Sequence, residues 1–246
     1  MRTVLFIAAI LPLAACSVSA GTGDADDGTP GIAAQGSGNT RTFAVSDFTA
    51  VDLRGADDVD VRVGPGFSVR ADGDAELLDH LKISKDGNTL RIARLRKDGW
   101  NWSGTEARIS VTLPQLGVAS VAGSGDMTVD RVTGASFKGA AAGSGSIEVA
   151  ALQVERADIS LAGSGDVKLA GTAKQLQVSI AGSGDVDAGG LRASQAEVSI
   201  AGSGSVRAEV EGPAKVNVMG SGDVDLGGKA RCQTSKMGSG TIRCGG

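Results

Sequence analysis

The clearest candidates for chemistry in this sequence are acidic and hydroxyl residues that follow a repeated Gly-Ser-Gly tripeptide. The position after each tripeptide holds, in chain order, Asp126, Ser146, Asp166, Asp185, Ser205, Asp223 and Thr241. Carboxylate and hydroxyl oxygens suit hard cations, but only Asp166 and Asp185 are acids in adjacent copies, and calcium takes about six to eight oxygen ligands. We therefore expect at most a weak cation or glycan surface at Asp126, Asp166, Asp185 and Asp223. The simpler alternative is that these side chains bind turn amides and keep this face wet.

A second candidate is a segment that combines two tryptophans with two cations. Residues 95–105 include Arg96, Lys97, Trp100 and Trp102, and the rest of the chain has no similar stretch. Such side chains could stack on sugars or contact a membrane or a protein partner. The alternative is a loop that packs over the end of the fold.

Composition argues against several function classes. His80 is the one histidine, so a Ser-His-Asp triad would depend on it and a zinc site with several histidines is impossible. We expect His80 to be a surface residue. The formal net charge is −4 and no basic cluster is present, which argues against a nucleic-acid partner. We predict no catalytic residue, no metal site and no cofactor.

The N-terminal residues have the pattern of an export signal. Arg2 is followed by an apolar run over residues 4–11, which is too short to span a bilayer as a helix of about 20 residues. The block Leu13-Ala14-Ala15-Cys16 resembles the bacterial lipobox, in which the cysteine is lipidated after cleavage. We predict a signal peptide over residues 1–15 and a lipid anchor on Cys16. The alternative is an ordinary signal peptide with Cys16 incidental.

Three regions are predicted: the signal peptide, the lipidated Cys16 with a flexible tether over residues 16–40, and a folded domain over residues 41–246. The tether is rich in Gly, Ser, Thr and Asp and lacks sustained periodicity. Ser17 follows the anchor cysteine where an inner-membrane lipoprotein would carry Asp, which by resemblance favours the outer membrane. The periplasmic or surface side stays open.

An internal repeat dictates the fold. The tripeptide Gly-Ser-Gly begins at Gly123, Gly143, Gly163, Gly182, Gly202, Gly220 and Gly238. Apolar residues alternate with polar ones on both sides of each copy, which indicates strands, and glycine permits a bend between them. Aromatic residues make up only 3% of the chain, so small side chains must fill the core. We predict an all-β fold, a right-handed parallel β-helix or β-solenoid with coils of about 20 residues.

Residues 41–115 show the same alternation without the glycine corner. We predict strands over residues 48–53, 59–63, 90–93 and 109–113, and a short helical turn over residues 75–80. These strands are interpreted as the start of the same sheet system.

Two cysteines flank the last glycine corner symmetrically. Cys232 and Cys244 each lie six residues from Gly238, on the inward parity, where another copy has Leu176 and Ala188. A corner that folds the two arms together would bring their Cα atoms to disulfide distance, and an oxidising cell envelope would form the bond. We predict this disulfide; the alternative is two buried free thiols.

With these residues described, the sequence resembles the Putative auto-transporter adhesin, head GIN domain family. The resemblance runs from about Phe43 to Gly246 and rests on Phe48-x-x-Val51-x-Leu53-x-Gly55, on Val111-Thr-Leu-Pro114-x-Leu116 and on the serial Gly-Ser-Gly-Asp turns. It implies an exported β-solenoid, often lipid-anchored, with an adhesive or surface role and no catalytic motif. We therefore expect a non-catalytic envelope lipoprotein that acts as an adhesion, binding or scaffold module for a glycan or surface protein. A polysaccharide-active β-helix enzyme is the alternative, and fold analogy alone does not establish it.

Overall fold

Nearly all regular structure in this protein is β-strand. The computed structural model describes residues 28–95 and 107–245. Within these ranges nineteen strands form a single sheet, and there is one short helix. Cys16 and the predicted contact residues Arg96, Lys97, Trp100 and Trp102 lie outside the described residues.

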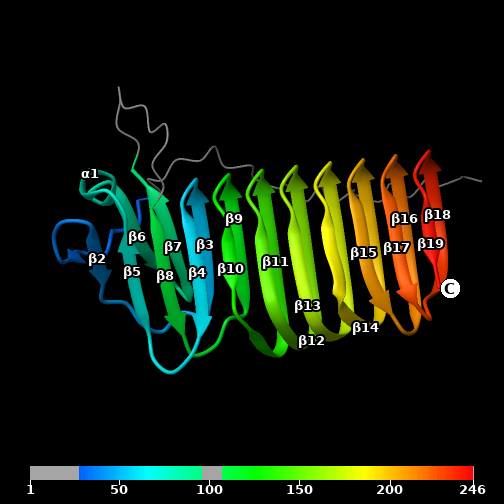
Figure 1. Cartoon of the computed structure of the whole chain (residues 1–246), viewed down its shortest axis with the longest axis horizontal. Helices are drawn as coiled ribbons and strands as arrows, with labels where there is room; N and C mark the ends of the chain where they lie inside the picture. Colours follow the sequence, from blue (N-terminus) through cyan, green and yellow to red (C-terminus); the bar gives the residue numbers. More distant parts are fainter. Residues whose placement is uncertain (1–27, 96–106, 246) are drawn as a thin grey trace, which may run out of the picture.

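The C-terminal part is a stack of parallel coils (Figure 1). Its strands are β9 (Val118–Gly123), β10 (Met127–Val129), β11 (Val132–Gly143), β12 (Ile147–Gly163), β13 (Val167–Gly182), β14 (Val186–Gly202), β15 (Ser205–Val210), β16 (Pro213–Gly220), β17 (Asp223–Gly228), β18 (Arg231–Gly238) and β19 (Ile242–Cys244). Each pairs in parallel with the strand one coil further on. The register places Gly143 beside Gly163 and Gly163 beside Gly182. The predicted β-solenoid with coils of about 20 residues is confirmed, with about six turns.

Small apolar side chains fill the interior of the coils. The inward residues of β12, such as Ile147, Val149 and Leu161, are almost completely buried, and Val167 continues the first of these columns in the next coil. Burying a Val, Leu or Ile side chain contributes about 1.5–3 kcal/mol. Because each column repeats along the stack, the same core is extended with every coil.

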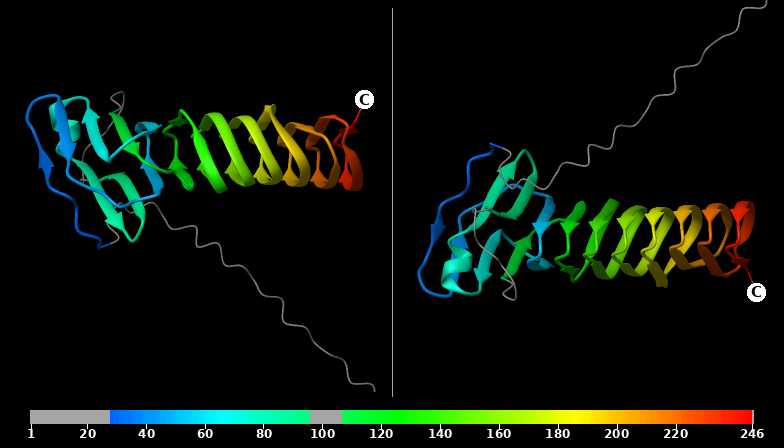
Figure 2. Two further views of the ribbon diagram at one scale, coloured as in Figure 1. Left: turned by 90° about the horizontal axis from the view of Figure 1, so that it is seen from below. Right: turned by 90° about the horizontal axis from the view of Figure 1, so that it is seen from above.

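The N-terminal region adds antiparallel strands to the stack and is broader than the coils (Figure 2). Parallel strands continue the solenoid: β3 (Ala50–Gly55) pairs with β9, and β4 (Asp58–Val63) pairs with β10. On their other edges, β3 pairs in parallel with β7 (Thr89–Arg94) and β4 with β8 (Arg108–Leu113). The prediction that these strands begin the same sheet system is therefore confirmed. Antiparallel pairing, which the sequence did not predict, joins β1 (Ala34–Gln35), β2 (Thr40–Phe43) and β5 (Ser68–Asp72), and joins β6 (Leu81–Asp86) to β7.

The helical turn predicted over residues 75–80 is present as α1 (Ala75–Leu78). The side chain of Asp74 caps it by accepting a hydrogen bond from the Glu76 amide. Leu77 and Leu78 are buried in the core. The helix therefore helps to cover the N-terminal end of the sheet.

The predicted tether does not extend to residue 40. The Ile32 amide donates a hydrogen bond to the carbonyl of Ile83 at 2.7 Å, and β1 pairs with β2, which itself starts at Thr40. Local composition suggested a flexible segment here. Pairing with distant strands satisfies its backbone groups instead, which no local pattern indicates.

The first corner of the stack was also missed. Gly55 has φ 140° and lies beside Gly123, so Gly55-Ala56-Asp57 occupies the place of a Gly-Ser-Gly tripeptide. In later coils a Cβ on the second glycine would meet backbone: at Gly125 it would lie 2.1 Å from the carbonyl oxygen of Asp57.

Candidate functional site

The aspartates that follow the glycine corners form a column along one edge of the solenoid, called here the acidic column: Asp126, Asp166, Asp185 and Asp223. Asp126 Oδ1 accepts a hydrogen bond from the Ser146 amide at 2.9 Å, and Asp185 Oδ1 accepts one from the Ser205 amide at 2.7 Å. Asp166 and Asp223 make the same contact to the amides of Asp185 and Thr241. Each of these carboxylates therefore ties one coil to the next.

These contacts are the ones that the turn-amide alternative requires. Asp58 extends the column by one coil, because the Asp126 amide donates to its Oδ1 at 3.4 Å. In residues 28–95 and 107–245, no group of three or more His, Cys, Asp and Glu side chains is arranged to hold a metal ion. Weak cation or glycan binding at the column stays a prediction.

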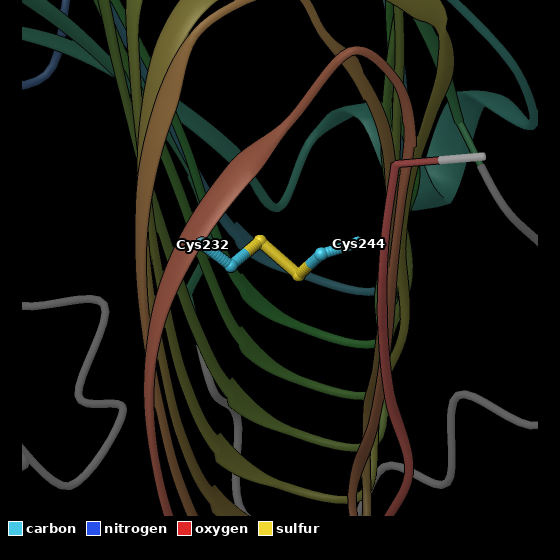
Figure 3. The surroundings of a disulfide bond; sticks show 2 residues. All are labelled: Cys232 and Cys244. Atoms are coloured by element: carbon cyan, nitrogen blue, oxygen red, sulfur yellow. A yellow bond between two sulfur atoms is a disulfide. The ribbon is translucent and has the colours of Figure 1, made fainter.

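The disulfide predicted between Cys232 and Cys244 is confirmed. The two Cα atoms are 6.1 Å apart. Figure 3 shows the bond crossing the interior of the last coil, from one wall to the other. Cys232 lies beside Ala214 and Cys244 beside Leu226, so both cysteines take core positions of the preceding coil.

The last coil also places polar residues where other coils are apolar. Thr234 and Lys236 lie beside Val216 and Val218, and the Lys236 Nζ donates to the carbonyl of Gly240 at 2.8 Å. Both residues are exposed, and polar side chains of this kind suit a coil face that is not covered by another coil. The inward parity of Thr234 and Lys236, at positions that are apolar in other copies, is the sequence signal for this difference.

A buried ion pair holds the two chain ends that flank residues 96–106. Asp57 is completely buried, and its Oδ2 accepts a hydrogen bond from Arg94 Nε at 2.7 Å. The amide of Ala107 donates to the other carboxylate oxygen at 2.9 Å. Arg94 ends β7 and Ala107 immediately precedes β8, so Asp57 joins the end of one strand to the start of the other.

A polar groove of about 380 Å³ runs along the last five coils. Buried Leu176, Ala196 and Ala214 lie at its floor. Its sides are formed by the polar residues Arg156, Asp158, Gln175, Gln177, Gln195, Glu197, Lys215, Arg231 and Gln233. These residues were not predicted as a site. The sequence signal for them is that they hold the same outward positions in successive repeats.

A sequence profile decides the family. The profile of the Putative auto-transporter adhesin, head GIN domain matches residues 47–230. The chain belongs to this family. The match starts just before β3 and ends just before β18, so it covers this head GIN domain from β3 to β17.

Solved structures resemble this head GIN domain over most of its length. A protein described as a putative adhesin from Bacteroides fragilis is 25% identical, with a TM-score of 0.79 over 83% of this chain and 95% of that chain. A protein from Parabacteroides distasonis, described as a putative lipid binding protein, is also 25% identical, with a TM-score of 0.64 over 85% and 97%. A putative adhesin from Parabacteroides merdae, 19% identical with a TM-score of 0.65 over 86% and 99%, has the same fold. No protein with a curated description matches significantly.

Within the parts of the head GIN domain that the structure describes, no helix is both long and apolar enough to cross a bilayer. The predicted attachment to a membrane rests on Cys16, which lies outside these parts.

Proposed function

We propose that this protein is a non-catalytic adhesion or binding module of the bacterial cell envelope, tethered by a lipid on Cys16. The observation that carries the proposal is the surface of the solenoid from Val118 to Cys244. Its coils are joined by short corners. Because the strands pair in register, an outward residue of one coil lies beside the equivalent outward residue of the next. A uniform surface of this kind offers many equivalent contacts to an extended ligand.

The proposal draws further support from the relatives. The family and the B. fragilis protein are both described as putative adhesins, and the P. distasonis protein is described as a putative lipid binding protein. The lipobox-like block at Leu13 to Cys16 supplies the attachment to the outer membrane. The ligand is a glycan or a surface protein.

Attachment of this kind favours weak but repeated binding. Many copies anchored on one cell convert modest single contacts into strong adhesion, because later contacts form at high effective concentration. Adhesion of this kind does not require a deep cleft, unlike most catalysis.

The experiment immobilises the mature chain and screens it against glycans and extracellular matrix proteins, while cleavage of the same glycans is followed by chromatography. We expect retention of at least one ligand class without turnover. Released products would overturn the non-catalytic assignment, and a chain that retains nothing would overturn the adhesive one. Phospholipid vesicles serve as a third surface, and binding to vesicles alone would replace adhesion with lipid binding.

A further inference from the structure

We propose that the groove along β12 to β18 binds an acidic oligosaccharide, one that carries carboxylate groups. This inference rests on the proposed function and names the ligand class and the place where it binds. The groove is distinct from the acidic column at the corners, which the sequence analysis singled out.

The sides of the groove are built as two parallel columns of mainly polar side chains, and Pro213 lies beside Arg231 in the first column. In one column Arg156 lies beside Gln175, and Gln175 lies beside Gln195. Neighbouring side chains in such a column are separated by the strand spacing of about 4.8 Å. Five coils therefore give a track of roughly 19 Å, which suits a short extended chain.

The second column repeats the arrangement two residues further along each strand. Asp158 lies beside Gln177, Gln177 beside Glu197, and Glu197 beside Lys215. An amide side chain offers both donors and an acceptor, as sugar hydroxyl groups do. Two parallel columns of this type, side by side on one face, match a ligand whose polar groups repeat along its length.

Most of these side chains have no partner within the protein. In the described part of the chain, Gln175, Gln177 and Gln195 make no side-chain hydrogen bond, and Arg156 and Arg231 make no ion pair. Glu197 and Lys215 pair with each other at 3.4 Å. The unpaired amides and guanidinium groups can therefore bind a ligand without breaking contacts of the fold.

Charge selects the acidic class of sugar. The groove holds three cationic side chains, Arg156, Lys215 and Arg231, against two acidic ones, in a protein whose formal net charge is −4. With Lys215 already paired, the free cations are the two arginines, in the first and last of the five coils. Arginine binds carboxylates in bidentate fashion through its planar group.

The lining of the groove favours a sugar over a protein. Leu176, Ala196 and Ala214 are buried in the core between the two columns, so the exposed lining of the groove is formed mainly by polar side chains. Protein interfaces usually centre on large aromatic anchors in desolvated pockets, and the groove has no aromatic residue.

The test uses the mature full chain and isothermal titration with oligogalacturonides and alginate oligosaccharides as acidic probes, and with cello-oligosaccharides of equal length as neutral ones. We expect the acidic probes to bind more tightly. The double variant Arg156→Ala/Arg231→Ala should weaken this binding by about tenfold or more, because charge-assisted hydrogen bonds are lost. Gln175→Ala/Gln195→Ala should weaken both probe classes.

Matched controls are available on other faces of the same coils. Arg207 and Gln153 are exposed residues of β15 and β12 outside the groove, and Arg207→Ala and Gln153→Ala should leave the affinities unchanged. Circular dichroism of each variant verifies folding, since surface substitutions have small effects on stability.

Three results would overturn the inference: no binding of the acidic probes, equal binding of neutral probes, or unchanged affinity in the double arginine variant. If the same preparation still adheres to a matrix protein or another glycan, the proposed adhesive function stands and only the groove assignment is lost.

Discussion

The carboxylate of Asp57 is completely buried and lies against the guanidinium group of Arg94, whose side chain is 12% exposed. Two nitrogens of Arg94 donate to the two carboxylate oxygens, and the Ala107 amide supplies a third hydrogen bond. Asp57 belongs to the corner after β3, whereas Arg94 and Ala107 flank the segment that follows β7. The pair therefore links two turns of the sheet at its N-terminal end.

Replacing Arg94 should destabilise the protein strongly. Arg94→Leu leaves the Asp57 carboxylate buried without its cation, which costs about 3–5 kcal/mol of unfolding free energy. Chemical denaturation measures this cost. The control is Arg108→Leu, which removes an exposed ion pair to Asp60 and should cost about 0–1 kcal/mol. Similar losses for the two variants would contradict the structural role of the buried pair.

Corner glycines should differ in their tolerance of alanine. Gly163 has φ 126°, and a Cβ there would lie 2.3 Å from the carbonyl oxygen of Gly143, so Gly163→Ala combines backbone strain with a clash. Gly55 has φ 140° but nothing within 4 Å, so Gly55→Ala carries only the strain, about 1–3 kcal/mol. We expect Gly163→Ala to cost about 1–3 kcal/mol more, the usual range for overpacking.

Thermal and urea unfolding of the two glycine variants provide the comparison. Gly165→Ala adds a useful third case, because its Cβ would lie 2.1 Å from the Gly145 carbonyl oxygen although its φ is not positive. If all three variants lost the same stability, close stacking of the corners would not be what requires glycine.

Removing the disulfide should loosen the last coil. Cys232 and Cys244 are separated by 12 positions, and closing a loop of this size contributes about 3 kcal/mol through the entropy of the unfolded chain. In Cys232→Ser/Cys244→Ser, hydrogen exchange should accelerate in β18 and β19. Amides in β12 and β13 serve as the internal reference, because each coil contacts only its neighbours. Unchanged exchange in β18 and β19 would show that the bond does not stabilise this end.

Asp72 should contribute to the acid sensitivity of the N-terminal region. A hydrogen bond from Arg70, and a second from Thr40, hold the pKa of the Asp72 carboxyl below its usual value. Its stabilising contribution is therefore complete above the unfolded pKa of about 4 and is lost as pH falls through the lower folded pKa. The free energy of unfolding of wild type minus that of Asp72→Asn should be largest near neutral pH and should shrink in acid. A difference that grows in acid would reverse the assigned sign.

Cys16 should be lipidated after export. Mass spectrometry of the mature protein from membranes of a bacterial host should give an N-terminal residue 16 that carries acyl chains. Cys16→Ser should move the protein from the membrane fraction to the soluble fraction. An unmodified N-terminus at residue 17 or 21 would contradict the lipid anchor.

The sequence by itself determined the solenoid and its terminal disulfide. Both follow from order along the chain: the spacing of the Gly-Ser-Gly copies sets the coil length, and side-chain parity puts Cys232 and Cys244 inside. The corner aspartates were recognised for the same reason, because they hold one fixed place in each copy.

Only the tertiary structure decided the features that depend on which distant residues become neighbours. Gly55 is a corner because β3 stacks under β9, and residues 31–40 are ordered because they pair with strands far along the chain. Asp57 and Arg94 are 37 positions apart, and no repeat links them. The groove exists because outward residues of five coils are aligned by the strand register. A local pattern fixes the direction of a side chain, whereas its neighbours are set by pairing free energies summed over the whole sheet.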